Sequence, residues 1–473
     1  MTLKRLFLIS IFFLGMACNT VTRTLEVPTA GLPPTIAPPP TAVPLATVAP
    51  APTRADSLYI PPGCENAPLA TVDPTEVAGH PLVVPTPTVE PNPTISQDKQ
   101  LAVFEDFAET VSEVYLYPDF NGHDWAAITA KYRARVKSGL DTETFYTDMN
   151  AMIAELGDDH SRFQSPAEVK QEDADLAGVT DYVGIGVLVQ PLLDKGYVTI
   201  LAVSPDSPAD HAGLKPHDNI LSADDLPLIE DGVYLPRVRG PECTAVVLSV
   251  QTPGQSARDM TVVRRRITAF NSVRAELLPT TDGSRIGYIF LPSFFDETIP
   301  GHVKEALQAF GDLDGLIIDN RLNGGGSSTV VEPILGYLAK GTLGQFRSRA
   351  ESRPLTVQPD PVNNSQTVPL VILVGKGTVS FGEIFSGALQ DSGRAKIVGV
   401  LTDGNVETLY PYYFEDGSRA WIAHERFEPA VSHADWETNG IIPDVAVADP
   451  GWDTVTLATD PTVAAAVMLL GHK

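Results

Sequence analysis

The residue whose surroundings best suit covalent chemistry is Ser380. Residues 369–374 form a continuous apolar run, which is typical of a strand buried on both faces, and apolar residues follow at helical spacing at Ile384 and Ala388. Between a strand and a helix, a serine hydroxyl projects from the carboxyl edge of the sheet, beside helix N–H groups that can bind an anion. Because such serines are often helix N-caps, the local sequence leaves a nucleophile and a capping residue both open.

The segment from Thr378 to Ala395 reads T-x-S-x-x-E-I-x-x-G-A-L-Q-D-x-G-R-A and resembles the nucleophile segment of the S41 serine peptidases. This family includes the C-terminal processing proteases and the tricorn core protease. The resemblance runs from roughly residue 100 to 450 and implies Ser380 as the nucleophile. The fold that it implies is α/β, a crotonase- or ClpP-like sheet core with an N-terminal helical cap and an inserted β-rich PDZ domain. Glu383 and Arg394 also match the segment, and we interpret them as a helix-end ion pair.

A glycine-rich loop follows another predicted strand, residues 315–319, and contains Gly324, Gly325 and Gly326. Glycines let the backbone approach a substrate closely, whereas a flexible turn would explain one glycine but not three. In the family this loop faces the nucleophile. The resemblance therefore predicts an oxyanion hole made by an amide of Gly324 or Gly325 together with the amide of Phe381.

The residue that would activate the serine is not the usual one. Processing proteases of the family place a lysine twenty-five residues after the serine and a glutamine four residues further on, where this chain has Asn405 and Leu409. An asparagine amide cannot take a proton from a hydroxyl at neutral pH. Lys376 and Lys396 do not replace the missing lysine, because one lies in the turn before the serine and the other in the next strand pattern. A Ser–Lys dyad is therefore not expected.

His160 is the alternative base, because the tricorn branch of the family pairs its serine with a histidine from the cap and a distant glutamate. His160 follows a predicted helix in the matching position, and Glu437 lies in a matching E-x-x-G segment before a P-D strand start. A histidine can act as base and then as acid when a carboxylate orients it. We therefore assign His160 as base and Glu437 as orienting group. The alternatives are a capping role for His160 and the rival histidines His424 and His433.

The N-terminus predicts export. Lys4 and Arg5 precede an apolar run at residues 6–14 that is too short to span a bilayer comfortably, and small residues then lead to Cys18. We predict a signal peptide over residues 1–18 of the lipoprotein type, with Cys18 lipidated as the mature N-terminus. Ordinary signal cleavage is the alternative. The expected location is the cell envelope, with the protein lipid-anchored to the outer face of the membrane.

Residues 19–98 are rich in Pro, Thr, Ala and Val and predict an extended spacer that cannot fold by itself. The exception is the stretch from Tyr59 to Cys64, which could dock on the folded body. Cys64 and Cys243 form an even pair in an exported chain, so a disulfide and two unlinked thiols both remain open. No cysteine cluster is present, so no structural zinc site is expected, and no cofactor is implied.

The remaining chain divides into four predicted parts: a helical cap over 99–178, a PDZ domain over 179–267, a protease core over 268–450 and a C-terminal helix over 451–473. PDZ domains add a peptide to a sheet edge and hold its carboxylate with backbone N–H groups. The resemblance assigns this task to Val183, Gly184, Ile185 and Gly186. The alternative is a small β domain that only separates the two halves.

The formal net charge of −26 argues against nucleic acid as a partner. We therefore expect an exported serine endopeptidase that forms an acyl-enzyme on Ser380 and cleaves unfolded or C-terminally exposed proteins. The main alternative is an inactive relative that acts as a tethered peptide-binding adaptor. A lipid carrier built on the related crotonase-like core has no residue that favours it.

Overall fold

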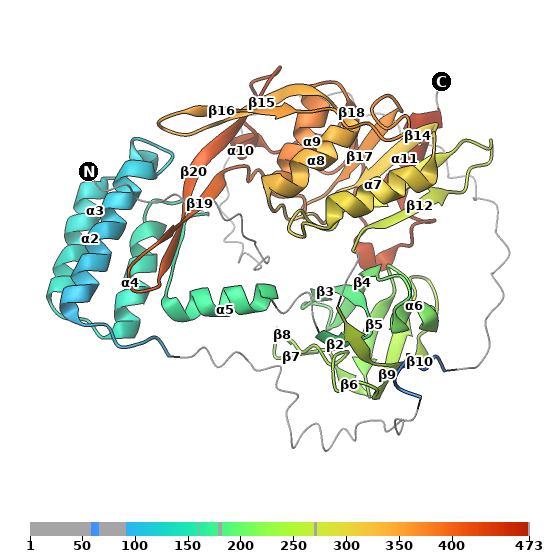
Figure 1. Cartoon of the computed structure of the whole chain (residues 1–473), viewed down its shortest axis with the longest axis horizontal. Helices are drawn as coiled ribbons and strands as arrows, with labels where there is room; N and C mark the ends of the chain where they lie inside the picture. The colour runs from blue at the N-terminus through green and yellow to red at the C-terminus, as the bar shows by residue number, and fades with distance from the viewer. Residues whose placement is uncertain (1–57, 66–90, 159, 178–181, 269–271, 472–473) are drawn as a thin grey trace.

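The structure of the chain is a computed structural model that describes residues 58–65, 91–158, 160–177, 182–268 and 272–471. Figure 1 shows three regions: helices at the N-terminal side, an α/β core, and a β-rich module formed by residues 182–267, which we call the β-module. In this view the core lies to the right of the N-terminal helices, and the β-module lies below the core.

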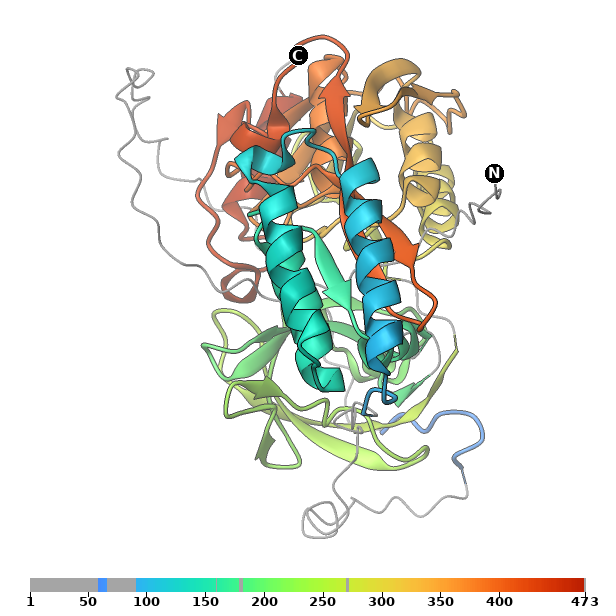
Figure 2. The ribbon, with the colours of Figure 1, turned by 90° about the vertical axis from the view of Figure 1, so that its left-hand side faces the viewer.

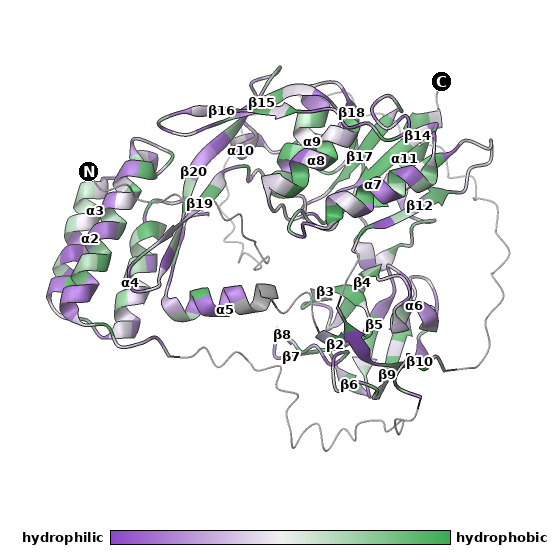
Figure 3. Cartoon of the chain, viewed as in Figure 1, coloured by the Kyte–Doolittle hydropathy of each residue, from purple (hydrophilic) through white to green (hydrophobic). Residues whose placement is uncertain are grey.

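The core is built on a six-stranded sheet with the strand order β12-β13-β14-β17-β18-β21, which is parallel except for the β12–β13 pair. The strands are β12 (Arg274–Leu278), β13 (Ile286–Phe290), β14 (Gly315–Asp319), β17 (Leu370–Val374), β18 (Ala395–Gly399) and β21 (Val445–Ala446). Figure 3 shows how apolar these central strands are, as expected for a sheet covered on both faces.

Alternate residues of these strands point to opposite faces of the sheet and enter two separate clusters. One face packs against α7 (Ile299–Phe310), α8 (Ser328–Leu338) and α9 (Phe381–Asp391). The other face packs against α11 (Pro461–Gly471) and Trp452 of the short helix η2 (Trp452–Thr454). The strands at 315–319 and 370–374 lie where the sequence predicts them.

The cap consists of α2 (Gln97–Val114), the short helix η1 (Phe120–Gly122), α3 (Trp125–Lys137) and α4 (Thr142–Ala154), and Figure 2 shows α2 and α3 running side by side. Its packed part begins earlier than predicted, because Ile95 is buried in the cap and Asn92 bonds Glu143. The predicted spacer therefore ends before Asp98. Helix α5 (Pro166–Ala177) then leads from the cap toward the β-module (Figure 1).

A second sheet, with the order β1-β20-β15-β16 and β19 paired to β20, joins the cap to the core. Ala420, Ile422 and Ala423 of β20 pack in the cap cluster, whereas Phe427 of the same strand packs in the core cluster. One long strand therefore fixes the position of the cap on the core. The strands are β1 (Arg162–Gln164), β15 (Gly341–Arg347), β16 (Ser352–Val357), β19 (Thr408–Tyr413) and β20 (Arg419–Pro429).

The β-module is a six-stranded antiparallel sheet around a small core, with two short two-stranded ladders beside it. Its main sheet has the order β10-β9-β5-β4-β3, and β6 pairs with β5 off this path. Among the described strands, β3 therefore pairs with β4 alone. The elements are β2 (Tyr182–Gly184), β3 (Val187–Leu192), β4 (Tyr197–Val203), α6 (Pro208–Ala212), β5 (Asn219–Ala223), β6 (Leu226–Pro227), β7 (Ile229–Glu230), β8 (Val233–Tyr234), β9 (Ala245–Gln251), β10 (Arg258–Val263) and β11 (Arg265–Ile267).

The segment 58–65 docks on the β-module, which confirms the exception predicted within the spacer. Cys64 and Cys243 form a disulfide, and the Tyr59 ring stacks on His211 with centroids 3.7 Å apart. The open question of paired or unlinked thiols is thereby resolved in favour of the disulfide. Cys18 lies outside the described residues. Among the helices that the structure describes, none combines the length and the apolar character needed to cross a membrane.

Candidate active site

Ser380 lies immediately before α9, in a backbone conformation that L-residues rarely adopt, with φ 56° and ψ −125°. Such a conformation costs of order 1–3 kcal/mol and persists only where the surroundings enforce it, which is common at functional sites. The Ser380 hydroxyl makes no capping hydrogen bond to the helix. The capping alternative is therefore wrong, and Oγ is left for another task.

Buried polar groups enforce this turn. The Asn320 amide donates to the Gly382 carbonyl at 2.8 Å, and the Thr378 hydroxyl donates to the Asn320 carbonyl at 2.7 Å. The Val379 N–H donates to the Asn323 carbonyl at 3.0 Å. Since Asn320, Asn323 and Thr378 are all fully buried, these bonds are shielded from competing water and hold the serine turn against the loop after β14.

The glycine loop lies directly against the serine, as predicted. A Cβ at Gly325, where φ is +92°, would lie 2.7 Å from the Ser380 Cβ and 3.0 Å from the Phe381 nitrogen. The Gly325 N–H donates to Asn323 Oδ1 at 2.9 Å, so it is not available to an oxyanion and this candidate donor was wrong. In the described part of the chain, the N–H groups of Gly324 and Phe381 have no hydrogen-bond partner.

Neither candidate lysine reaches the serine. Lys376 pairs with Asp403 at 2.5 Å and Lys396 pairs with Asp444 at 2.7 Å, and both lysine side chains are more than half exposed. The Asn405 side chain makes no hydrogen bond to any residue that the structure describes, although its backbone N–H is bound. The geometry thus contains no Ser–Lys pair among these residues.

Glu383 has a different role from the predicted ion pair with Arg394, and that prediction was wrong. Glu383 is fully buried and accepts hydrogen bonds from the Thr402 hydroxyl at 2.6 Å, the Gly404 N–H at 3.0 Å and the Asn405 N–H at 2.8 Å. The Arg394 guanidinium instead donates to two backbone carbonyls. Burial raises the pKa of Glu383, although these hydrogen bonds oppose the rise. Glu383 therefore anchors the 402–405 loop one helical turn from Ser380.

His160 and Glu437, which are 277 residues apart in sequence, form a hydrogen bond of 2.8 Å between Nε2 and Oε1. His160 lies between α4 and β1, and Glu437 lies in the short helix α10 (Trp436–Asn439). The other Glu437 oxygen accepts the N–H groups of Val406 at 2.6 Å and Glu407 at 3.1 Å. Val406 directly follows Asn405, whose N–H bonds Glu383 in the first turn of α9. The His160–Glu437 pair therefore contacts the same loop that Glu383 anchors.

The surroundings favour a charged pair. Burial alone would lower the pKa of His160, but the hydrogen bond and charge of Glu437 and the charges of Glu407 and Asp158 outweigh burial and raise that pKa above 6.5. Burial would likewise raise the pKa of Glu437, yet the contact with His160 and the two backbone N–H groups hold it below its ordinary value. Glu437 is thus an ionised acceptor able to stabilise a protonated His160.

The orientation of the His160 ring decides which of its nitrogens is left for the serine. Nε2 contacts Glu437, so Nδ1 is the nitrogen that can face the serine. Within the described structure no hydrogen bond joins His160 and Ser380. The rival histidines have other partners: His424 Nδ1 contacts the Tyr412 hydroxyl, and His433 Nδ1 contacts Glu428.

Glu407 is a site residue that the sequence did not reveal. One of its oxygens accepts a hydrogen bond from the Tyr117 hydroxyl, and its side chain converges with those of His160 and Glu437. Burial, with the nearby charge of Glu437, raises the pKa of Glu407 to about 7. No spacing pattern identifies it, because Tyr117, His160 and Glu407 come together only through the packing of the cap on β19 and β20.

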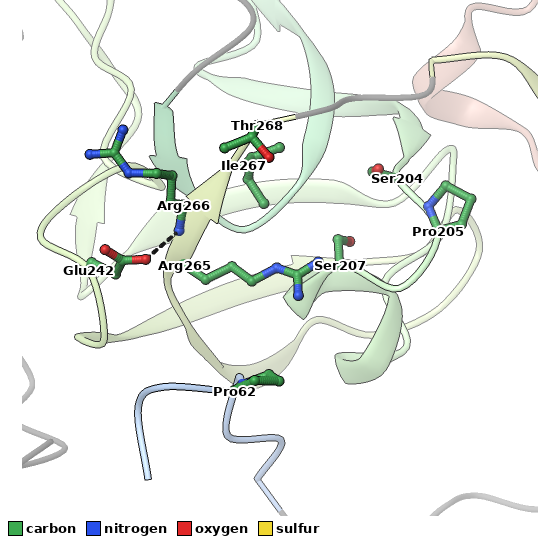
Figure 4. Close-up of a pocket in the computed structure, with 9 residues that line it drawn as sticks. All are labelled: Pro62, Ser204, Pro205, Ser207, Glu242, Arg265, Arg266, Ile267 and Thr268. Atoms are coloured by element: carbon green, nitrogen blue, oxygen red, sulfur yellow. Dashed lines mark hydrogen bonds between the residues drawn. The ribbon is translucent and has the colours of Figure 1, made fainter. Parts of the chain in front are cut away.

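The predicted peptide-binding residues of the β-module lie at one end of its sheet. Val183 and Gly184 belong to β2, which pairs with β11, and the carbonyls of Ile185 and Gly186 accept the N–H groups of Ala209 and Ser204. A pocket of about 410 Å³ adjoins this end (Figure 4). Its lining comprises Pro62, Ser204, Pro205, Ser207, Glu242, Arg265, Arg266, Ile267 and Thr268. The docked segment 58–65 therefore forms one wall of the pocket through Pro62.

Two protein-family models match the chain. Residues 285–447, which hold every strand of the core sheet except β12 together with Ser380 and Glu437, match peptidase family S41. Residues 97–154 match the tricorn protease C1 domain. The second match covers the cap helices α2 to α4 that precede His160.

Full-length relatives agree with these matches. The chain is 29% identical over 381 residues to a carboxyl-terminal-processing protease of Synechocystis sp., which covers 76% of this chain and 84% of the relative. A solved structure of a putative S41 protease from Bacteroides fragilis, 16% identical, covers 78% of this chain and 97% of its own with a TM-score of 0.52, which concerns the fold alone. A carboxyl-terminal-processing protease of Picosynechococcus sp. is 30% identical over 375 residues, 76% of this chain and 86% of the relative. The chain therefore belongs to peptidase family S41 and is a serine peptidase related to the carboxyl-terminal-processing proteases.

Proposed function

We propose that the chain is an exported endopeptidase that uses Ser380, His160 and Glu437 in place of a Ser–Lys dyad. The observation that carries the proposal is the bond between His160 Nε2 and Glu437 Oε1, beside the loop that holds Asn405. His160 Nδ1 takes the proton of Ser380 Oγ as the hydroxyl attacks the substrate carbonyl, and Glu437 stabilises the imidazolium. Nδ1 then returns the proton to the leaving amine, and a water molecule releases the acyl group from Ser380.

The N–H groups of Gly324 and Phe381 are the proposed donors to the developing oxyanion. Both lack a hydrogen-bond partner in the described structure, and Gly325 brings the loop into van der Waals contact with the serine turn. Each such donor is worth roughly 10²–10³-fold in rate. Because Ser380 and His160 are not yet hydrogen-bonded, they must approach each other when substrate binds, as catalytic pairs often do.

The β-module fits a PDZ domain that presents substrates to this site. Its outermost strand β3 has a partner on one side only among the described strands, so an extended peptide can add to the free edge. We propose that the turn at Val183, Gly184, Ile185 and Gly186 receives the peptide's terminal carboxylate. Substrates would then be unfolded or C-terminally exposed proteins outside the cytoplasm, with the lipid at Cys18 holding the enzyme on the membrane.

A tethered peptide-binding adaptor is the second candidate, and the missing Ser380–His160 hydrogen bond together with Asn405 favours it. A fluorophosphonate probe distinguishes the two, because it labels an activated serine whatever the natural substrate. We expect the full-length chain to be labelled, Ser380→Ala and His160→Ala to lose labelling, and Asn405→Ala to retain it. Absence of labelling in the unmodified chain, with native folding confirmed by circular dichroism, would favour the adaptor.

A further inference from the structure

Three ionisable side chains from distant segments of the chain converge at one point. His160 follows α4, Glu407 precedes β19 and Glu437 lies in α10. One nitrogen or oxygen atom from each of the three lies within 4.8 Å of the other two. The proposed peptidase mechanism uses His160 and Glu437 and assigns no role to Glu407.

Glu407 is costly to bury without a cation. Its side chain is 5% exposed, and Oε2 has no hydrogen-bond partner in the part of the chain that the structure describes. Its raised pKa of about 7 reflects the same burial and the neighbouring carboxylate. A positive ion between the two carboxylates would pair with the free oxygen and remove the repulsion between Glu407 and Glu437.

We infer that His160, Glu407 and Glu437 form a binding site for a zinc-type divalent cation, with a fourth position open to water. One imidazole nitrogen and two carboxylate oxygens are a donor set that suits Zn²⁺, whereas Ca²⁺ requires six or more oxygens and Mg²⁺ keeps most of its water. Ligand atoms around tetrahedral zinc are about 3.4 Å apart, given metal–ligand bonds of about 2.1 Å. The His160–Glu437 contact of 2.8 Å needs to open by only a small side-chain movement.

The groups behind the two carboxylates are suited to hold them. The Tyr117 hydroxyl bonds the Glu407 carboxylate, and the N–H groups of Val406 and Glu407 bond the far oxygen of Glu437. Outer partners of this kind orient metal ligands and commonly change metal affinity by about 10–100-fold. These hydrogen bonds are present without a cation, so the two carboxylates are already positioned to bind one.

The cation regulates the proposed reaction, and this part of the inference rests on the proposed function. Zinc on Nε2 replaces the Glu437 contact and withdraws electron density from the ring. A neutral imidazole that binds zinc through Nε2 carries its proton on Nδ1. His160 Nδ1 then has no lone pair to accept the Ser380 proton, so the peptidase is reversibly inhibited and a chelator restores it.

Binding is tested without reference to catalysis, in the full-length chain carrying Ser380→Ala. Isothermal titration with Zn²⁺ and visible absorption with Co²⁺ measure stoichiometry, affinity and coordination. We expect one ion per chain and the intense absorption of four-coordinate cobalt. Glu407→Gln should weaken zinc binding at least tenfold. His424→Gln is the matched control, since this half-buried histidine of β20 lies outside the cluster, and it should bind as the parent does.

Melting temperatures measured without metal establish that each variant is folded. Equal affinity in the parent and in Glu407→Gln, or no binding in the parent, would overturn the inference. Inhibition is measured separately on the chain with Ser380 intact. Zinc binding without any peptidase activity would retain the site and reject the proposed function. Peptidase activity that zinc leaves unchanged, together with no binding, would reject the site and retain the function.

Discussion

The two halves of the candidate site are built in different ways. The serine half, formed by the α9 turn and the glycine loop, rests on fully buried side chains of Asn320, Thr378 and Glu383 that bond backbone groups nearby. The histidine half joins the cap to α10, and its side chains remain partly accessible, 13% for His160 and 22% for Glu437. The serine half is a rigid part of the core, whereas the histidine half is an interface between two regions.

This difference assigns separate tasks to the two halves. A buried network in a low-dielectric interior fixes one geometry, which suits a nucleophile and an oxyanion hole. A polar interface between cap and core is easier to shift, and the missing Ser380–His160 hydrogen bond lies at that boundary. Loss of the nucleophile from the serine half should therefore abolish activity, and changes in the histidine half should lower the rate and shift its pH dependence.

The largest expected effect comes from Ser380→Ala. Removing the nucleophile should lower peptide hydrolysis by roughly 10⁴–10⁶-fold, because the acyl-enzyme cannot form. Hydrolysis of an unfolded protein substrate, followed by mass spectrometry, measures the loss. Ser392→Ala is the matched control at the other end of α9, where the hydroxyl bonds only the Ala388 and Leu389 carbonyls, and it should retain full activity. A loss smaller than about 100-fold in Ser380→Ala would reject Ser380 as nucleophile.

Glu437→Gln should have the next largest effect, lowering the rate by roughly 10²–10⁴-fold while the protein stays folded. The base must be neutral, so activity of the parent falls as pH drops through the raised pKa of His160. The variant loses the carboxylate that raises this pKa, and its acidic limb should move to lower pH. A pH profile of kcat/KM measures both effects. With His433→Gln as control, an unmoved acidic limb in Glu437→Gln would mean that another group acts as the base.

The same contrast explains what the sequence could predict. Strand, serine and helix are contiguous, and the glycine loop directly follows another strand. Local patterns therefore indicate Ser380, Phe381 and the loop after β14. The assignment of Glu383 to an ion pair failed because its partners are backbone N–H groups of a loop some twenty residues away, which no spacing reveals. Glu407 was missed for the same reason: its neighbours come from the cap. His160 and Glu437 could be predicted from the sequence only through its resemblance to a known family.

Glu383→Ala should affect both stability and rate. It leaves the Thr402 hydroxyl and the N–H groups of Gly404 and Asn405 without their buried acceptor, at a cost of about 3 kcal/mol in the free energy of unfolding. The 402–405 loop should then loosen, and the rate should fall by roughly tenfold to a hundredfold. Urea unfolding and steady-state kinetics measure the two effects. Glu332→Ala on the exposed side of α8 is the control, and equal stability of the two variants would contradict the anchoring role.

The smallest expected effect is that of Asn405→Ala, at the position where processing proteases carry lysine. The Asn405 side chain makes no hydrogen bond to the described residues, and alanine retains the N–H that Glu383 accepts. If His160 is the base, the rate should change by less than about threefold, as for a substitution that removes no transition-state contact. Steady-state kinetics on the same protein substrate give the comparison with Ser380→Ala. A loss above tenfold with unchanged stability would place the Asn405 amide among the groups that contact substrate, and the histidine half would then need a third member.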